Sequence, residues 1–288
     1  MKFLKGEVVH TITALHAVSF AESAYRQIAA YLSKVGAFSY SVTLGGTKLA
    51  NGTITSMDDA EIVGEYVKIR SNLAVEAFNY SNMITIDFAG NTASYSVYGL
   101  LEEGVTASAQ DAALANLLKA AYNYGVAAEE LRYGTASATA FDGVTYTGDY
   151  SGKASATTAD GSYKFIGTGL SLGKDVSMNF YMKAETLDGL TFTAASAKGA
   201  LDASRITVTP FAGNSQYNVV VTLKLDIASM SEVFTLTALN AEGTAVATCT
   251  NSVAYGCMTY INQNNEYTPV SKALLTYVEK AVEYVASR

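Results

Sequence analysis

The sequence predicts a mainly β protein of the α+β kind, with two tandem antiparallel β-sandwich-like domains that are each closed by an amphipathic helix. Three observations predict this class: many short segments alternate between apolar and polar residues, the second half repeats the order of the first, and helical periodicity recurs at equivalent places. The chain has 288 residues. That length is comfortable for two domains of about 140 residues.

Alternating segments that are rich in β-branched residues and end at Gly, Asn or Asp are typical of antiparallel strands. Phe38–Leu44 alternates in this way and stops at Gly45–Gly46. Successive side chains of a strand point to opposite faces, so each such segment can bury one face. The other segments with this pattern are 66–70, 83–88, 176–182, 206–210, 218–225 and 233–239.

Three segments have the periodicity of amphipathic helices. The first is Ala21–Val35. The second starts near Ser108, whose spacing to Asp111 resembles a capping box, and the third starts at Thr268–Pro269, an N-cap followed by proline. Gly125 lies inside the second helix, where glycine costs about 1 kcal/mol relative to alanine. Close contact between helix and sheet would explain it, and Gly125→Leu is therefore expected to disrupt the first domain.

The two halves contain the same succession of segments. The strand 83–88 corresponds to 233–238, Ser96–Val97 to Ser252–Val253, and Leu117–Leu118 to Leu274–Leu275. Two copies of a module explain this better than a solenoid, which needs three or more repeats. The small, polar stretch 133–140 separates the copies. We therefore predict a first domain at residues 1–134, with an N-terminal helix, and a second at residues 135–288.

The composition excludes some classes of function. The net charge is −7, so binding to the phosphates of nucleic acid is not expected. No apolar run approaches the roughly 18 residues of a membrane span. Glu7 and His10 interrupt the apolar run that a signal peptide requires. The chain is therefore cytosolic, a component of a virion, or a segment of a larger secreted protein, and we favour the last.

Nothing in the sequence predicts an enzyme. The only histidines, His10 and His16, lie six residues apart without a cluster of Cys or carboxylates around them. The nucleophile-elbow and phosphate-loop motifs are absent from the sequence. The acidic residues lie in polar, loop-like contexts, whereas a general acid needs an apolar pocket.

Two minority hypotheses concern metals and cysteines. Carboxylates in loops could supply the oxygen ligands of calcium, against the simpler interpretation of solvated loops, and no other cofactor is predicted. Cys249 and Cys257 are either a disulfide or two small buried hydrophobic residues. The candidate calcium ligands are Asp58, Asp59 and Glu61, or Asp142 with Asp149.

Three tyrosines are candidates for sugar contacts. Tyr146, Tyr150 and Tyr163 lie in a polar, loop-rich stretch, and aromatic rings can pack against the apolar faces of sugars. The absence of tryptophan weakens this hypothesis. The competing interpretation is that these tyrosines lie at edges with their hydroxyls in water.

Two passages resemble a known module. Leu117–Ala128 contains Tyr-Asn-Tyr-Gly-x-Ala-Ala and is similar to the helix that closes C-terminal accessory β-sandwich modules in large secreted and cell-surface proteins of gut Firmicutes. Residues 169–182 resemble the strands that open the same module. The resemblance covers part of the chain, and the helix after Pro269 lacks the Tyr-Gly pair. It implies an extracellular location and a non-catalytic, accessory role.

Taken together, we expect a non-catalytic extracellular module of a bacterial surface protein that serves structure, adhesion or self-assembly. Its partners would be further copies of itself or other surface proteins. The alternatives are a glycan-binding module that recognises polysaccharide, and a structural protein of a virion.

Overall fold

The computed structural model describes residues 15–18, 38–44, 47–54, 61–63, 66–70, 75–88, 91–172 and 176–288. The chain divides into two compact units, of which the first ends at Ala140 and the second runs from Phe141 to Arg288. The boundary predicted after residue 134 lies in the coil just before this division. The helix predicted at 21–35 lies outside the described residues, as do Asp58 and Asp59.

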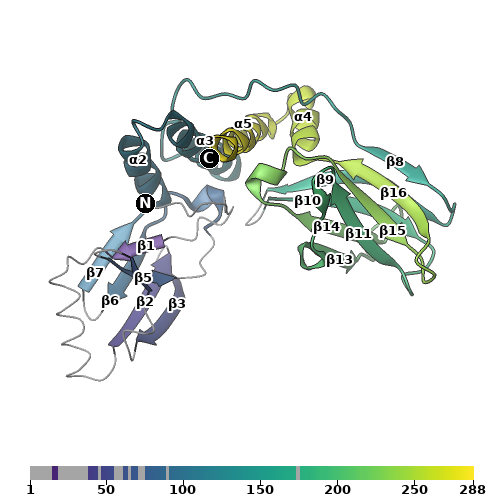
Figure 1. Cartoon of the computed structure of the whole chain (residues 1–288), viewed down its shortest axis with the longest axis horizontal. Helices are drawn as coiled ribbons and strands as arrows, with labels where there is room; N and C mark the ends of the chain where they lie inside the picture. Colours follow the sequence, from purple (N-terminus) through teal and green to yellow (C-terminus); the bar gives the residue numbers. More distant parts are fainter. Residues whose placement is uncertain are drawn as a thin grey trace. The chain divides into compact units, whose positions relative to one another are not determined.

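The first unit contains two antiparallel sheets followed by two helices (Figure 1). One sheet has the order β1 (Leu15–Val18), β5 (Tyr66–Arg70), β4 (Glu61–Val63). The other has the order β3 (Thr47–Ile54), β2 (Phe38–Leu44), β6 (Ile84–Phe88), β7 (Asn91–Tyr95). The short 3-10 helix η2 (Ala77–Asn79) precedes β6, and the helices α2 (Val97–Ala107) and α3 (Ala112–Tyr133) follow β7.

Among the described residues, the second unit has the same plan with two additional strands. One sheet has the order β13 (Ile206–Pro210), β14 (Val219–Lys224), β10 (Val176–Ala184), β9 (Tyr163–Leu172). The other has the order β12 (Gly199–Ala200), β11 (Thr191–Ser196), β15 (Phe234–Leu239), β16 (Ala245–Asn251), β8 (Ser155–Thr158). The 3-10 helices are η3 (Ala203–Arg205) and η4 (Ile227–Ser229), and α4 (Val253–Gln263) and α5 (Thr268–Ala286) end the chain.

The strand pairings of the two units correspond one to one. β5 lies between β1 and β4 as β14 lies between β10 and β13, and β6 lies between β2 and β7 as β15 lies between β11 and β16. The additional strands β8 and β9 occupy sheet edges next to β16 and β10. The repeat therefore extends from the sequence to the topology of the sheets. The prediction of a β-rich protein with antiparallel strands is confirmed.

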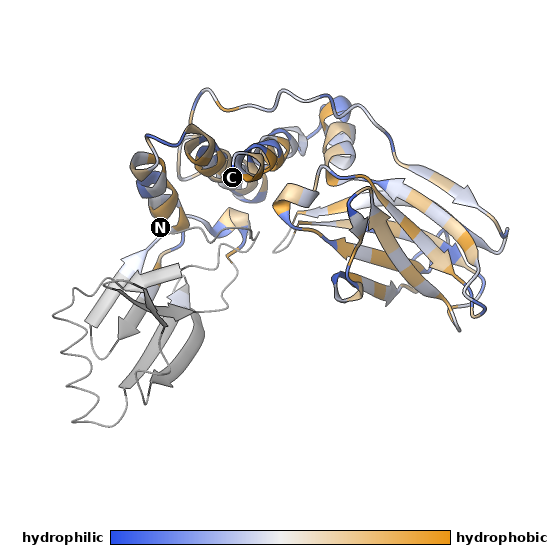
Figure 2. Ribbon diagram, viewed as in Figure 1, coloured by the Kyte–Doolittle hydropathy of each residue, from blue (hydrophilic) through white to orange (hydrophobic). Residues whose placement is uncertain are grey.

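Alternation along the strands explains the core of the second unit. On β10, Met178, Phe180 and Met182 are fully buried, and Phe180 lies opposite Val221 of β14. Leu236 and Ala238 of β15 are likewise buried, while Thr237 between them is partly exposed. Figure 2 shows apolar and polar residues alternating along these strands. Burial of one face in this way is the hydrophobic driving force for the unit.

Helices α2 and α4 were not expected from the sequence. Each starts at a serine cap: the Oγ of Ser96 accepts from the N–H of Gly99, and the Oγ of Ser252 accepts from the N–H of Tyr255, both at 3.0 Å. Each then donates one backbone N–H to the turn before the preceding hairpin. These bonds are Tyr98 to the carbonyl of Tyr80 and Ala254 to that of Met230, both 3.2 Å.

The starts of the long helices need correction. Asp111, rather than Ser108, caps α3 by accepting from the N–H of Leu114, and the backbone of Ser108 closes α2. Thr268 is the first residue of α5, and Tyr267 before it occupies the cap position. The hydroxyl of Thr268 donates to the carbonyl of Tyr260 in α4 at 3.1 Å. Within the described part of the chain, no helix is both long and apolar enough to cross a membrane.

Candidate functional site

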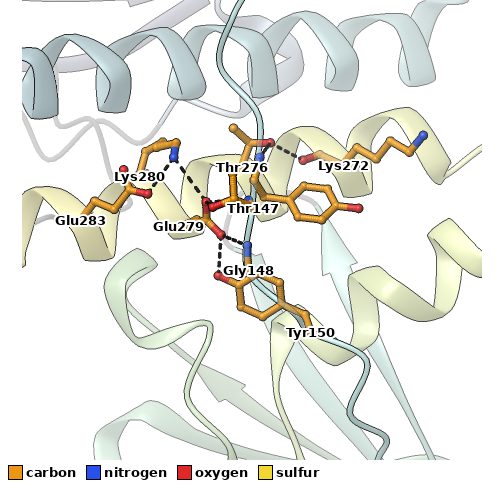
Figure 3. Close-up of polar contacts among 9 residues, drawn as sticks. Thr147, Gly148, Tyr150, Lys272, Thr276, Glu279, Lys280 and Glu283 are labelled. Atoms are coloured by element: carbon orange, nitrogen blue, oxygen red, sulfur yellow. Dashed lines mark hydrogen bonds and ion pairs between the residues drawn. The ribbon is translucent and has the colours of Figure 1, made fainter.

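The second unit holds a carboxylate inside a cage of hydrogen-bond donors (Figure 3). Glu279 of α5 is only 7% exposed. Its oxygens accept from the backbone N–H groups of Thr147 (2.8 Å) and Gly148 (2.7 Å), and from the hydroxyls of Thr147 (3.1 Å) and Tyr150 (3.0 Å). Burial alone would raise the pKa of Glu279, but the bonds from Gly148 and Thr147 outweigh it and lower the pKa. Glu279 is therefore a stable anion.

These donors belong to the segment Tyr146–Tyr150, which we call the strap. The strap has a second attachment to α5, because the N–H of Tyr146 donates to the Oγ1 of Thr276 at 3.1 Å. A Cβ at Gly148 would lie 2.8 Å from the ring of Tyr150 and 2.9 Å from Oε2 of Glu279, so a larger residue there would displace one of these two side chains. The strap, which lies near the start of the second unit, is thus bound to the last helix of that unit.

Lys280 balances the charge of Glu279. Its Nζ lies 3.3 Å from Oε1 of Glu279 and 2.7 Å from Oε1 of Glu283. Burial alone would lower the pKa of Lys280, but the bonds to Glu283 and Glu279 raise it. The ion pair and the strap together satisfy a buried charge that would otherwise be costly.

The structure brings together two of the three tyrosines that were candidates for sugar contacts. The rings of Tyr146 and Tyr150 meet edge to face with centroids 6.3 Å apart. The hydroxyl of Tyr150 is occupied by Glu279, and burial together with that carboxylate raises the pKa of Tyr150 to about 12. Tyr163 begins β9 opposite Ala184, so it belongs to a sheet edge and not to the strap. The hydroxyl of Tyr150 therefore helps to attach the strap to α5.

The candidate calcium ligands that the structure describes are exposed. Asp142 lies in a turn, and Asp149 accepts from the N–H of Ser151 at 3.0 Å. Hydrogen bonds from the side chain and the backbone of Ser151 lower the pKa of Asp149. Over the described residues, no group of three or more His, Cys, Asp or Glu could hold a metal ion. Asp58, Asp59 and the side chain of Glu61 are outside the described part.

The two cysteines are free and buried, so the disulfide hypothesis is not met. Cys249 lies in β16, where its neighbours are Leu236 and Ala156, and Cys257 lies in α4. Burial raises the pKa of Cys249 to about 11 and that of Cys257 to about 12. The structure agrees with the other interpretation, two small residues of the core.

The first unit contains a solvent-open cavity of about 550 Å³ that the sequence did not reveal. Glu102 lies at this cavity, and the hydroxyl of Tyr122 donates to its Oε1 at 2.7 Å. The rings of Tyr98 and Tyr122 have centroids 4.6 Å apart. Six hydroxyl-bearing side chains line the cavity: Ser81, Ser96, Tyr98, Tyr122, Ser137 and Thr139. We call it the hydroxyl pocket.

Glu129 of α3 stands behind the wall of this pocket and organises it. Its carboxylate accepts from the hydroxyl of Ser81, and from the N–H (2.8 Å) and hydroxyl (2.7 Å) of Ser137. Burial would raise the pKa of Glu129, but the bonds from Ser81 and Ser137 lower it. Burial and the charge of Glu129 raise the pKa of Tyr98 far above its ordinary value. These groups come from segments up to 56 residues apart in the sequence, between Ser81 and Ser137. Glu129 shares one face of α3 with residues 118, 122 and 125, and this helical spacing is the only signal in the sequence that could have pointed to it.

No protein-family model matches the chain, and no curated protein and no solved structure is significantly similar to it.

Proposed function

We propose that the chain is a non-catalytic structural module of an extracellular surface protein, with two tandem β-sandwich-like domains, serving adhesion or assembly. Two features of the sequence support an extracellular, accessory role: few charged side chains (16%), and the resemblance of Leu117–Ala128 to the closing helix of surface-protein modules. The repeated order of strands and helices supports a modular protein.

The observation that carries this proposal is the attachment of the strap to α5. Thr147 and Gly148 are bound to Glu279, so the first and last segments of the second unit hold each other. If the chain is pulled from both ends, these contacts bear the load before the sheets can open. A module that joins its own ends resists extension, which is what a spacer or adhesion module requires.

The chemistry of the buried carboxylates supports a non-catalytic role. A general acid needs a raised pKa near the working pH. Glu129 and Glu279 have lowered pKa values, because several donors stabilise each anion. Both carboxylates therefore serve as fixed acceptors that hold segments in place.

Stretching the full chain between its ends with optical tweezers tests the proposal. We expect two unfolding events, and Glu279→Gln should lower the force of one of them while the other keeps its force. Glu283→Gln is the matched control: it changes a carboxylate on the same helix that is 46% exposed and forms an ion pair with Lys280. Equal forces in the parent chain and Glu279→Gln would refute a load-bearing strap.

The solution mass of the full chain separates assembly from a purely tethering role. Size-exclusion chromatography with light scattering, with and without calcium, gives this mass. A polymeric or closed particle supports self-assembly, and a monomer of 30.4 kDa at all concentrations would contradict it.

A further inference from the structure

The helices that line the hydroxyl pocket have counterparts in the second unit, but polar residues at the pocket differ between the two units. Helices α2 and α4 begin 156 residues apart, at 97 and 253, and α3 and α5 do so at 112 and 268. The serine caps Ser96 and Ser252 correspond under this offset. Two polar residues of the pocket on α2 do not: Tyr98 and Glu102 correspond to Ala254 and Met258 of α4. The shared start of these helices therefore does not require Tyr98 and Glu102.

The groups at the pocket favour a neutral ligand that is rich in hydroxyls. Hydroxyls both donate and accept, and Glu102 adds a charged acceptor at an exposed position. The lining contains no Lys, Arg or His, so nothing there would balance an anion. The hydroxyl of Tyr98 is buried beside Glu129, so it belongs to the support of the wall rather than to the open surface of the pocket.

We propose that the hydroxyl pocket of the first unit is a binding site for a neutral pyranose, a single ring of a glycan. The volume of about 550 Å³ lies within the roughly 300–1,000 Å³ of ligand pockets. Glu102 and the hydroxyls of Ser96, Ser137 and Thr139 bond to the sugar hydroxyls, and Tyr122, which is buried, is a positioning residue that holds Glu102. Glu129 is a positioning residue, because it holds Ser81 and Ser137 in the wall.

An organic ammonium ion is the main competitor for the same pocket. It would need acceptors only, whereas most of the lining groups can also donate. Glu102 already accepts from Tyr122, and Glu129 is occupied by Ser81 and Ser137. The match between mixed donors and acceptors and the hydroxyls of a sugar therefore favours the pyranose.

Saturation-transfer NMR on the full chain tests the site. The probes are the methyl glycosides of glucose, galactose, mannose, N-acetylglucosamine and fucose at millimolar concentration, with ethylamine as the ammonium probe. We expect at least one glycoside to receive saturation, and Tyr122→Phe and Glu102→Gln to weaken its binding by roughly tenfold or more, the effect of losing a hydrogen bond to a charged group. Tyr150→Phe is the matched control, since it removes a tyrosine hydroxyl from a glutamate in the other unit.

Each outcome decides between the alternatives. Binding that survives Tyr150→Phe but is weakened by both pocket variants supports the proposal, and Glu102→Gln covers the case in which Tyr122→Phe disturbs the fold. Saturation of none of the five glycosides would overturn the proposal, and so would a response to ethylamine alone. Binding weakened by Tyr150→Phe, but by neither pocket variant, would place the sugar at the strap. The load-bearing role of Glu279 is independent of all these results.

Discussion

Glu279 accepts a hydrogen bond of 2.7 Å from the backbone N–H of Gly148, across 131 residues of sequence. The bond joins the beginning of the second unit to its last helix. A glycine suits this position, because a Cβ there would meet the ring of Tyr150 and the carboxylate of Glu279. The stability of the second unit should therefore depend strongly on these two residues.

Glu279→Gln should lower the free energy of unfolding of the second unit by about 2 kcal/mol, because an amide cannot satisfy all the donors and leaves one unpaired in a buried site. Urea unfolding followed by hydrogen exchange in α5 and the strap measures this loss. Glu283→Gln should cost less than about 1 kcal/mol, as is usual for a partly exposed ion pair. An equal loss in both variants would show that the strap contributes nothing special.

The stability of both units should fall in acid. Glu129 and Glu279 have folded-state pKa values below the ordinary 4.5. Their contribution is therefore complete above about pH 4.5 and is lost as the pH falls through the lowered folded-state values. Urea unfolding of the parent chain and of the Glu129→Gln, Glu279→Gln double variant, between pH 7 and pH 3, measures it. The difference between the two chains should shrink as the pH falls, and a constant difference would contradict the assignment.

Gly125→Leu should destabilise the first unit by about 2 kcal/mol, the usual effect of overpacking. The contact that requires glycine is with the rings of Tyr80 and Tyr98, and a Cβ would lie 3.0 Å from the latter and closer still to the former. It is therefore a contact with α2 and the turn after η2, rather than with a sheet. Gly161→Leu is the control, since a Cβ there meets nothing within 4 Å. Equal melting temperatures for the two variants would refute this account.

Cys249 and Cys257 should react with a thiol reagent only after unfolding. Both thiols are free and buried, and their raised pKa values leave little thiolate at pH 8. Labelling with a maleimide should be slow in the native chain and reach both cysteines in guanidinium. A chain that stays unlabelled even when unfolded without reductant would indicate a disulfide.

The sequence by itself determined the long helices α3 and α5 and some of the strands, but alternation did not mark β1, β3, β4, β7, β8, β11, β12 or β16. Alternation marked β13 at its observed bounds and β14 within one residue at each end, because a strand that buries one face must alternate. Local chemistry also marked the region where α3 and α5 begin. It did not reveal α2 and α4, since a glycine early in each helix resembles a turn and the bonds to Tyr80 and Met230 that hold their starts come from distant residues.

Only the tertiary structure decided which groups meet at the strap and the hydroxyl pocket. No local spacing relates Glu279 to Gly148, or Glu129 to both Ser81 and Ser137. In each case the burial of a helix face sets the position of the carboxylate, and hydrogen bonding of an anion in a poorly solvated place selects its partners. Patterns of hydrophobicity determine which face of a helix is buried. The partners of a buried charge depend instead on which distant segments the fold brings next to it.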